Sequence, residues 1–241
     1  MNSVLQVAAA ASRQIATAQA VVTNNLANAA ATGFKADMFY AEGNYTQAGA
    51  ENQGGLTAVD FRAGSIAQTG NDLDVAIVGE GWMQVITPAG EEVLSRRGDL
   101  RIDTDGNLID ATGNQILGDG GPINLPPSSS ITIGSDGVIS YIPIGETALG
   151  RVTQGRILLV NPDPATLSKG LDGHIRAEAG ANLEPSADVQ LSVGALETSN
   201  VNSIASMVQM IELARSFESH IQTMKSTDEL DASSASLMRL E

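Results

Sequence analysis

The hydrophobic period of this chain changes twice, and that change limits the fold more than any other feature. Alternating spacings of four and three residues mark the N-terminal part as helical. The positions in this stripe are Val4, Ala8, Ala11, Ile15, Ala18, Val22 and Asn25. In the middle of the chain the period falls to two, as in β-strands, and near the C-terminus the helical spacing returns. The second helical stripe consists of Met207, Met210, Ala214, Phe217, Ile221 and Met224.

These periods predict an α+β fold. Long N- and C-terminal helices are expected to pack together as a coiled-coil-like α domain, and short antiparallel strands and hairpins to form a central all-β domain. Asp105-Gly106 and Asp136-Gly137 are typical of hairpin turns, because positive φ is easily adopted there. The predicted parts are an N-terminal helix at 1–36, a connector at 37–63 that is exposed at 41–58, a β-rich domain at 64–192, and a C-terminal helix at 193–241.

The C-terminal stripe is wider than one helical partner requires. Ile204, Val208 and Ile211 form a second apolar row beside the methionine-containing stripe. Two interpretations remain open: a helical hairpin within one subunit, or helices that bury their wide faces between subunits. Ser199 or Asn200 is expected to cap the N-terminus of this helix.

Three asparagines stand at the end of the N-terminal helical pattern. Asn25 lies in the stripe itself, and Asn24 and Asn28 flank it one turn apart. A buried amide in a helix seam fixes the register, because one alignment satisfies its donors and acceptors; the alternative is simple capping by polar residues. Gly33 is expected to take the left-handed position after the helix, with Phe34 folding back onto the last turn.

Composition excludes several classes of protein. Against 28 acidic residues the chain has 13 Lys and Arg, a net charge of −15, so a nucleic-acid partner is not expected. Residues 1–36 differ, since their charged side chains are Arg13 and Lys35 alone. The chain has no cysteine, and we expect neither a cleavable secretory signal nor a bilayer-spanning segment.

No motif predicts catalysis, a cofactor or a metal. The stretch 103–110 resembles a calcium loop, but its glycine falls at the fourth position, not the sixth, which favours a β-turn. Glu91 and Glu92 are adjacent and would point to opposite faces of a strand. His174 and His220 lie in different segments without a ligand spacing. The protein is therefore not expected to be an enzyme.

Four ordered blocks resemble the bacterial flagellar axial proteins, the family of rod, hook and hook-associated proteins. The first block is Asn24-Asn25-Leu26-Ala27-Asn28 followed by Thr32-Gly33-Phe34-Lys35. The others are "GSIAQTGNDLDVAIVGEGWMQV" from Gly64, "SRRGDLRIDTDGNLIDATGNQILG" from Ser95, and "GALETSNVNSIASMVQMIELARSFE" from Gly194. Leu94 stands where the family commonly has an aromatic residue. Within the family, the length and the ending are most similar to a proximal rod protein, with a distal rod protein or a hook protein as the alternative.

The resemblance implies a structural subunit of the flagellar basal-body rod. Its terminal helices would polymerise, with copies of itself and other rod proteins, into the periplasm-spanning drive shaft that transmits torque and encloses the export channel. Delivery would be by the flagellar type III export apparatus, without membrane insertion. The residues expected to carry assembly or register are Ile15, Val22, Asn24, Asn25, Asn28, Gly33, Phe34, Met207, Met210, Ile211, Phe217, Ile221 and Met224.

Two other classes remain as alternatives. A cell-wall hydrolase with helical oligomerisation ends would require two convergent acids in a cleft. A secreted adhesin with a coiled-coil stalk would be expected to carry a cleavable signal and a longer heptad run.

Overall fold

The computed structural model describes residues 2–40, 56–146, 148–170, 172–178 and 180–238. The chain forms two compact units. We call them the helical unit, which comprises Met1–Ala29, Ala36–Asp60 and Val201–Glu241, and the β unit, which comprises Ala30–Lys35 and Phe61–Asn200. Residues 41–55 of the expected exposed connector lie outside the described residues.

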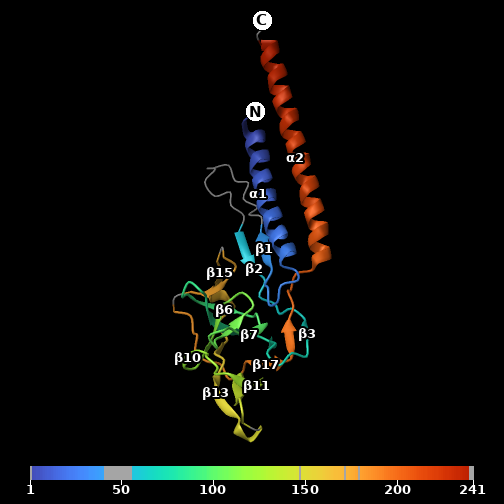
Figure 1. The fold of residues 1–241 in the computed structure, drawn as a ribbon. Helices are drawn as coiled ribbons and strands as arrows, with labels where there is room; N and C mark the ends of the chain where they lie inside the picture. The colour runs from blue at the N-terminus through green and yellow to red at the C-terminus, as the bar shows by residue number, and fades with distance from the viewer. Residues whose placement is uncertain (1, 41–55, 147, 171, 179, 239–241) are drawn as a thin grey trace. The chain divides into compact units, whose positions relative to one another are not determined.

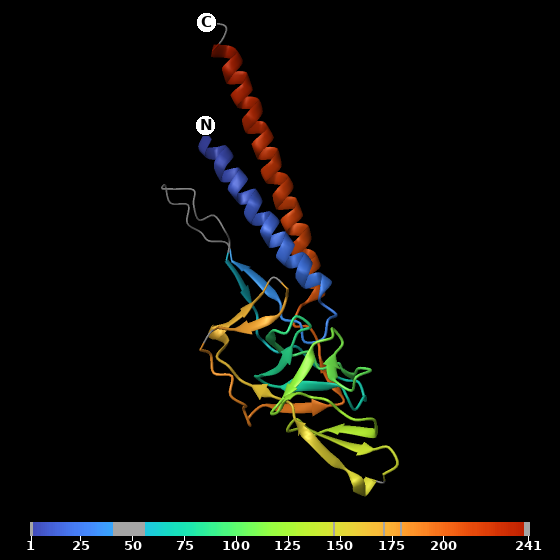
Figure 2. The same ribbon diagram turned by 60° about the vertical axis from the view of Figure 1, so that its left-hand side comes forward.

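The described part of the helical unit has two α-helices and a two-stranded sheet. Helix α1 (Asn2–Ala27) and helix α2 (Ser203–Met238) pack side by side and run antiparallel, so that the start of α1 and the end of α2 point the same way (Figures 1 and 2). Strands β1 (Asp37–Tyr40) and β2 (Leu56–Val59) pair antiparallel, and β1 packs on α1. The α1 sequence favours helix because alanine, which has the highest helix propensity, recurs throughout it.

The ends of the two helices differ from the expected ones. Helix α1 ends at Ala27 and not at residue 36, and residues 30–35 belong to the β unit. Helix α2 starts at Ser203, and its N-cap is Asn202, whose side chain accepts a hydrogen bond from the Ala205 amide at 3.0 Å. Ser199 and Asn200, the caps expected from the sequence, belong to the β unit.

The predicted coiled-coil-like α domain is wrong. A coiled coil inserts a and d side chains into holes on the partner helix, which buries them. Of the α2 side chains that the structure describes, none is fully buried. Two buried seam positions of α1, Ala8 and Ala18, carry alanine. Because the described α2 side chains remain at least partly uncovered, the two helices lie together without a continuous interlocking seam.

The β unit consists of short strands joined by tight turns. Its strands pair antiparallel, and two 3₁₀ turns, η1 (Ala148–Gly150) and η2 (Pro164–Thr166), interrupt them in the described region. The strands are β3 (Ile66–Gln68), β4 (Val75–Val78), β5 (Trp82–Ile86), β6 (Glu92–Ser95), β7 (Leu100–Ile102), β8 (Leu108–Asp110), β9 (Gln115–Gly118), β10 (Gly121–Pro122), β11 (Ser128–Ile133), β12 (Val138–Pro143), β13 (Val152–Arg156), β14 (Leu159–Val160), β15 (Leu167–Lys169), β16 (Ile175–Ala177), β17 (Gln190–Val193) and β18 (Ala195–Glu197).

The largest sheet in the described region has nine strands. Its main path runs β15-β16-β6-β5-β9-β8-β7, with β10 beside β9 and β14 beside β5. Strands β11, β12 and β13 form a second sheet, β4 pairs with β17, and β3 pairs with β18. The two predicted hairpins are present as β7–β8 and β11–β12, with Gly106 at φ 85° and Gly137 at φ 81° in their turns. Strands β4 and β5, although adjacent in sequence, belong to different sheets.

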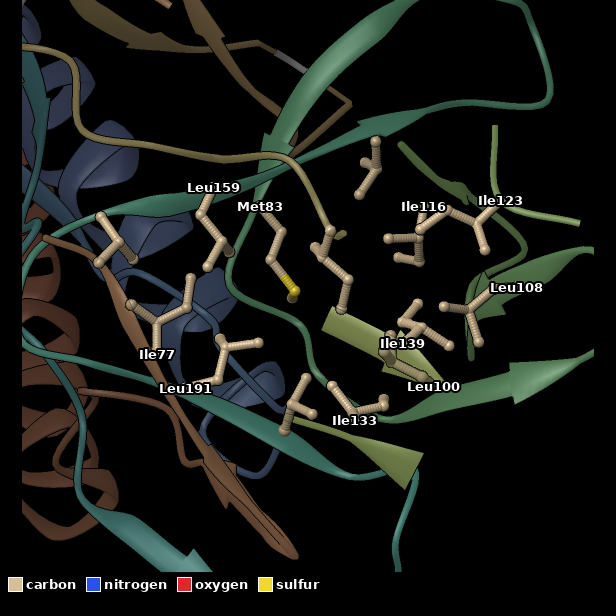
Figure 3. Packing of buried hydrophobic residues seen from close by; sticks show 14 of the residues in the cluster. Ile77, Met83, Leu100, Leu108, Ile116, Ile123, Ile133, Ile139, Leu159 and Leu191 are labelled. Atoms are coloured by element: carbon tan, nitrogen blue, oxygen red, sulfur yellow. The ribbon is translucent and has the colours of Figure 1, made fainter. Parts of the chain in front are cut away.

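One apolar cluster joins the nine-stranded sheet, the β11–β13 sheet and the β4–β17 pair. It draws its side chains from most of the strands of the β unit (Figure 3). The isoleucine and valine side chains suit the crowded face of a sheet, where β-branched residues pack well. The buried cluster is Val75, Ile77, Met83, Val85, Val93, Leu100, Leu108, Ile116, Ile123, Leu125, Ile133, Ile139, Ile157, Leu159, Val189 and Leu191.

Neither α1 nor α2, as far as the structure describes them, contains an apolar stretch long enough to cross a membrane.

Candidate assembly site

The Asn25 amide is bound to the backbone of strand β1. Its Nδ2 donates to the Asp37 carbonyl at 2.7 Å, and its Oδ1 accepts from the Asp37 N–H at 2.8 Å. The side chain is 9% exposed. The amide therefore has donor and acceptor partners inside its own subunit, and it fixes where β1 lies along α1. Its predicted role in the register between subunits is a separate matter and stays a prediction.

Asn24 and Asn28 satisfy groups at the end of α1. Asn28 Nδ2 donates to the Asn24 carbonyl at 2.9 Å and to the Asn24 side-chain oxygen at 2.8 Å. Asn24 Nδ2 in turn donates to an Asp37 carboxylate oxygen at 3.0 Å. The Asn24 carbonyl also accepts from the Asn28 N–H at 3.1 Å, so the Asn28 side chain reinforces the last turn of α1 within its own subunit.

The predicted apolar stripes divide into covered and exposed residues. On α1, Val22 is buried and Ile15 is half-buried. On α2, the half-buried predicted residues are Met210, Ile221 and Met224, and the exposed ones are Met207, Ile211 and Phe217.

The exposed apolar residues gather on the first turns of α2. We call Ile204, Met207, Val208 and Ile211 the α2 face; they are 75%, 51%, 52% and 55% exposed. At 100° per residue these side chains fall within roughly a third of the helix circumference. The same side of the helix continues with polar residues, such as the exposed Arg215. The α2 face is therefore a short apolar patch at one end of the helix.

Gly33 and Phe34 belong to the β unit and not to the end of α1. Gly33 has a left-handed backbone, φ 66°, and its N–H donates to the Glu197 carbonyl at 2.8 Å. A Cβ at this position would lie 2.5 Å from the Arg96 carbonyl carbon and oxygen. The Phe34 ring lies under the Lys169 ammonium, 4.1 Å from its centroid. Phe34 thus makes a cation–π contact, where the sequence predicted a contact with the last helical turn.

Three charged side chains form a buried ion cluster in the β unit. Lys35 Nζ lies 2.7 Å from Glu197 Oε1, and Arg96 Nη1 lies 2.9 Å from Glu197 Oε2. The Lys35, Arg96 and Glu197 side chains are 2%, 3% and 0% exposed. Arg96 also donates to the carbonyls of Gly79 and Gly81, at 2.6 and 2.9 Å, and lies over the Trp82 ring. Buried charges need such paired and hydrogen-bonded surroundings.

Sequence reasoning did not identify this ion cluster. Each of its members occurs in one of the resemblance blocks, but 162 positions separate Lys35 from Glu197. A local signal existed at Glu197, which occupies an inward position of strand β18 two residues after the buried Ala195. A charge at an inward strand position requires a partner, although the sequence does not reveal which one.

The described residues hold no group of three or more His, Cys, Asp and Glu side chains that could bind a metal ion. Arg176 donates hydrogen bonds to Asp172 and keeps the pKa of that carboxyl well below its usual range. That shift is opposite to the one that prepares a carboxyl group as a general acid near neutral pH.

Two family models match the chain. The C-terminal model of the flagellar basal body rod FlgEFG proteins matches residues 192–237, which include strand β18 and most of α2. The D1 domain model of the flagellar hook protein FlgE/F/G matches residues 76–141, within the β unit.

Full-length relatives extend this similarity. The chain is 32% identical over 240 residues to the flagellar basal-body rod protein FlgF of Escherichia coli (strain K12), covering 95% of each chain. It is 31% identical over 251 residues to FlgF of Salmonella typhimurium (strain LT2), covering 100% of both. A FlgG protein of Buchnera aphidicola subsp. Schizaphis graminum is 29% identical, covering 87% of this chain and 90% of its own length. The chain therefore belongs to the flagellar basal-body rod proteins, a family of structural proteins of the rod, and is most like FlgF.

Proposed function

We propose that this structural rod protein polymerises through its helical unit into the periplasm-spanning drive shaft, where it transmits torque and surrounds the export channel. Its neighbours would be copies of itself and other rod proteins, and it would reach the rod through the flagellar type III export apparatus. The FlgF-like sequence favours a proximal position in the rod. Polymerisation would use contacts that do not close into a ring, because such contacts extend as a helix.

The observation that carries this proposal is the exposed α2 face. Fully burying an exposed isoleucine or methionine side chain contributes about 1.5–3 kcal/mol, and the residues of the α2 face still expose half or more of their surface. Four such residues adjacent on one helix form a surface that neighbouring subunits can cover. Phe217, 36% exposed on α2, adds to the uncovered apolar surface of this helix.

The composition and shape of α1 also support close packing between subunits. The exposed residues Ala16, Thr17, Ala20 and Ala27 are small, and small residues allow helix axes to approach to about 8 Å, the short end of the usual range. Residues 1–36 contain no carboxylate. The net charge of the whole chain is −15, but neighbouring N-terminal helices could pack together without bringing carboxylates close to one another.

Substitution of the α2 face tests the proposal. We expect Met207→Glu with Ile211→Glu to abolish swimming and rod completion in a strain lacking the native gene, because two carboxylates would have to be buried between subunits. Gln209→Glu is the matched control, since Gln209 is exposed on α2 outside the α2 face. It adds a charge to the same helix and should leave swimming intact.

Both variants should be exported and fold with unchanged helical circular dichroism. Normal swimming and normal rods in the doubly substituted strain would refute the proposed role of the α2 face.

A further inference from the structure

Three segments of the β unit adjoin the points where the chain passes to the helical unit. The chain passes between the two units after residues 29, 35, 60 and 200. The β-unit segments next to these points are 30–35, 61–64 and 197–200, which we call the exit segments. If torque passes between the two units of a subunit, the covalent chain at the exit segments must carry part of it.

A single carboxylate joins all three exit segments. Glu197, in the last of them, accepts hydrogen bonds through Oε1 from Lys35 Nζ at 2.7 Å and from the Gly64 N–H at 2.9 Å. Its other oxygen, Oε2, accepts from Arg96, which follows strand β6 of the large sheet. The Glu197 side chain therefore ties the exit segments both to one another and to the nine-stranded sheet.

Further hydrogen bonds connect the same segments around Glu197. Lys35 Nζ donates to the Arg62 carbonyl at 2.8 Å, and Asn200 Nδ2 donates to the same carbonyl at 3.0 Å. The Gly33 N–H donates to the Glu197 carbonyl. A Cβ at Gly64 would lie 1.9 Å from the Thr198 carbonyl oxygen, so the second and third segments approach each other at a distance that only glycine permits.

We propose that the Lys35–Glu197–Arg96 cluster is an anchor that makes the three exit segments behave as one body under torque, with Glu197 as its central positioning residue. This inference rests on the proposed torque-transmitting function. Stability alone does not explain the buried ions, because a protein in which apolar residues of similar volume replace a buried ion pair is often equally or more stable. Directional hydrogen bonds from one carboxylate, in contrast, fix several segments at defined mutual positions.

Glu197→Gln is the sharpest variant, because it keeps the side chain's size. A glutamine offers one oxygen, so its NH₂ group must face either Lys35 and Gly64 or Arg96, all of which are donors. We expect native-state hydrogen exchange to show the amides of 30–35, 61–64 and 197–200 opening together in the full-length monomer. Their exchange should be at least about tenfold faster than that of β5 and β9 amides in the same variant, as for a cooperative unit that opens below global unfolding.

Lys35→Met and Arg96→Met should open the same three segments, and Lys35→Met combined with Glu197→Gln should cost less than the sum of the single changes. Arg176→Gln is the control, because it removes the exposed pairing of Arg176 with Glu91 and Asp172 and should leave the exit segments protected. Separate opening of the segments, or exchange at the rate of the core strands, would overturn the anchor.

A swimming assay in media of increasing viscosity tests the link to torque. We expect cells with Glu197→Gln to lose speed more steeply with viscosity than wild-type cells. Equal slopes, with the exit segments nevertheless opening together, would overturn the mechanical role. Failure of the proposed function would differ from both results, because the wild-type chain itself would then not restore swimming to the deletion strain.

Discussion

At the level of single residues, amide groups at the end of α1 organise the helical unit. Asn25 holds strand β1 through both backbone groups of Asp37, and the Asn28 side chain adds a second donor to the Asn24 carbonyl, which also accepts from the Asn28 N–H. The sequence predicted that these asparagines matter, since three amides at the end of an apolar helix need partners. It could not predict Asp37 as the partner, because an amide side chain can pair with many donors and acceptors and its identity does not specify which residue supplies them.

Replacing Asn25 by leucine should destabilise the helical unit. The change removes two hydrogen bonds to the half-buried backbone of Asp37, and each such bond contributes about 0.5–1.5 kcal/mol. We expect a correspondingly lower free energy of unfolding in urea, together with impaired rod assembly. Asn24→Ala is the control, because Asn24 is exposed and its side-chain bonds, to an Asp37 carboxylate oxygen and from Asn28, both join exposed groups; it should cost less than about 1 kcal/mol. Equal losses in the two variants would contradict the role of Asn25.

Gly33→Ala should be severely destabilising for two reasons that can be separated. An alanine in a left-handed backbone costs about 1–2 kcal/mol, and overlap of its Cβ with the Arg96 backbone should add about 1–3 kcal/mol. Gly90 is the matched control, because its φ is 85° and a Cβ there would meet no atom within 4 Å. Gly90→Ala should therefore show the first cost alone. Thermal unfolding that gave the same change for both would show that the contact with Arg96 is unimportant.

At the level of elements, the helices and hairpins followed from the hydrophobic period, but their boundaries and packing did not. The turns at Gly106 and Gly137 combine aspartate-glycine pairs with flanking apolar alternation, which is a local signal. Residues 30–35, which follow α1, contact Glu197 and the Arg96 backbone, far along the chain, and a local sequence pattern does not reveal such contacts. The coiled-coil-like packing failed because a heptad spacing records periodicity, not side-chain volume.

Helix α2 should be the most easily opened element of the free subunit. Its described side chains are at best half-buried, and segments with few buried contacts open at low free energy. Limited trypsin digestion of dilute monomer should therefore cut first after Arg215 or Lys225, before the exposed Arg101 of strand β7. Purified basal bodies should protect both α2 sites. First cleavage at Arg101 would contradict this ranking.

At the level of the whole molecule, family membership could be read from four ordered sequence blocks, and the comparisons with FlgF confirm it. The residues predicted to carry assembly fall into two groups in the structure. Met207 and Ile211 lie in the exposed α2 face, whereas Gly33 and Phe34 serve the β unit. The sequence shows which side of a helix is apolar. It does not show which residues on that side are covered by the neighbouring helix and which stay exposed.

The α2 face as a surface between subunits is best tested by cysteine labelling, because the native chain contains no cysteine. Ile211→Cys in an otherwise functional subunit should react rapidly with a maleimide in dilute monomer. In intact purified basal bodies the same cysteine should be protected, and it should become fully reactive again after dissociation in denaturant. Labelling of intact basal bodies at the monomer's rate would mean that no neighbour covers the α2 face, and would contradict the account.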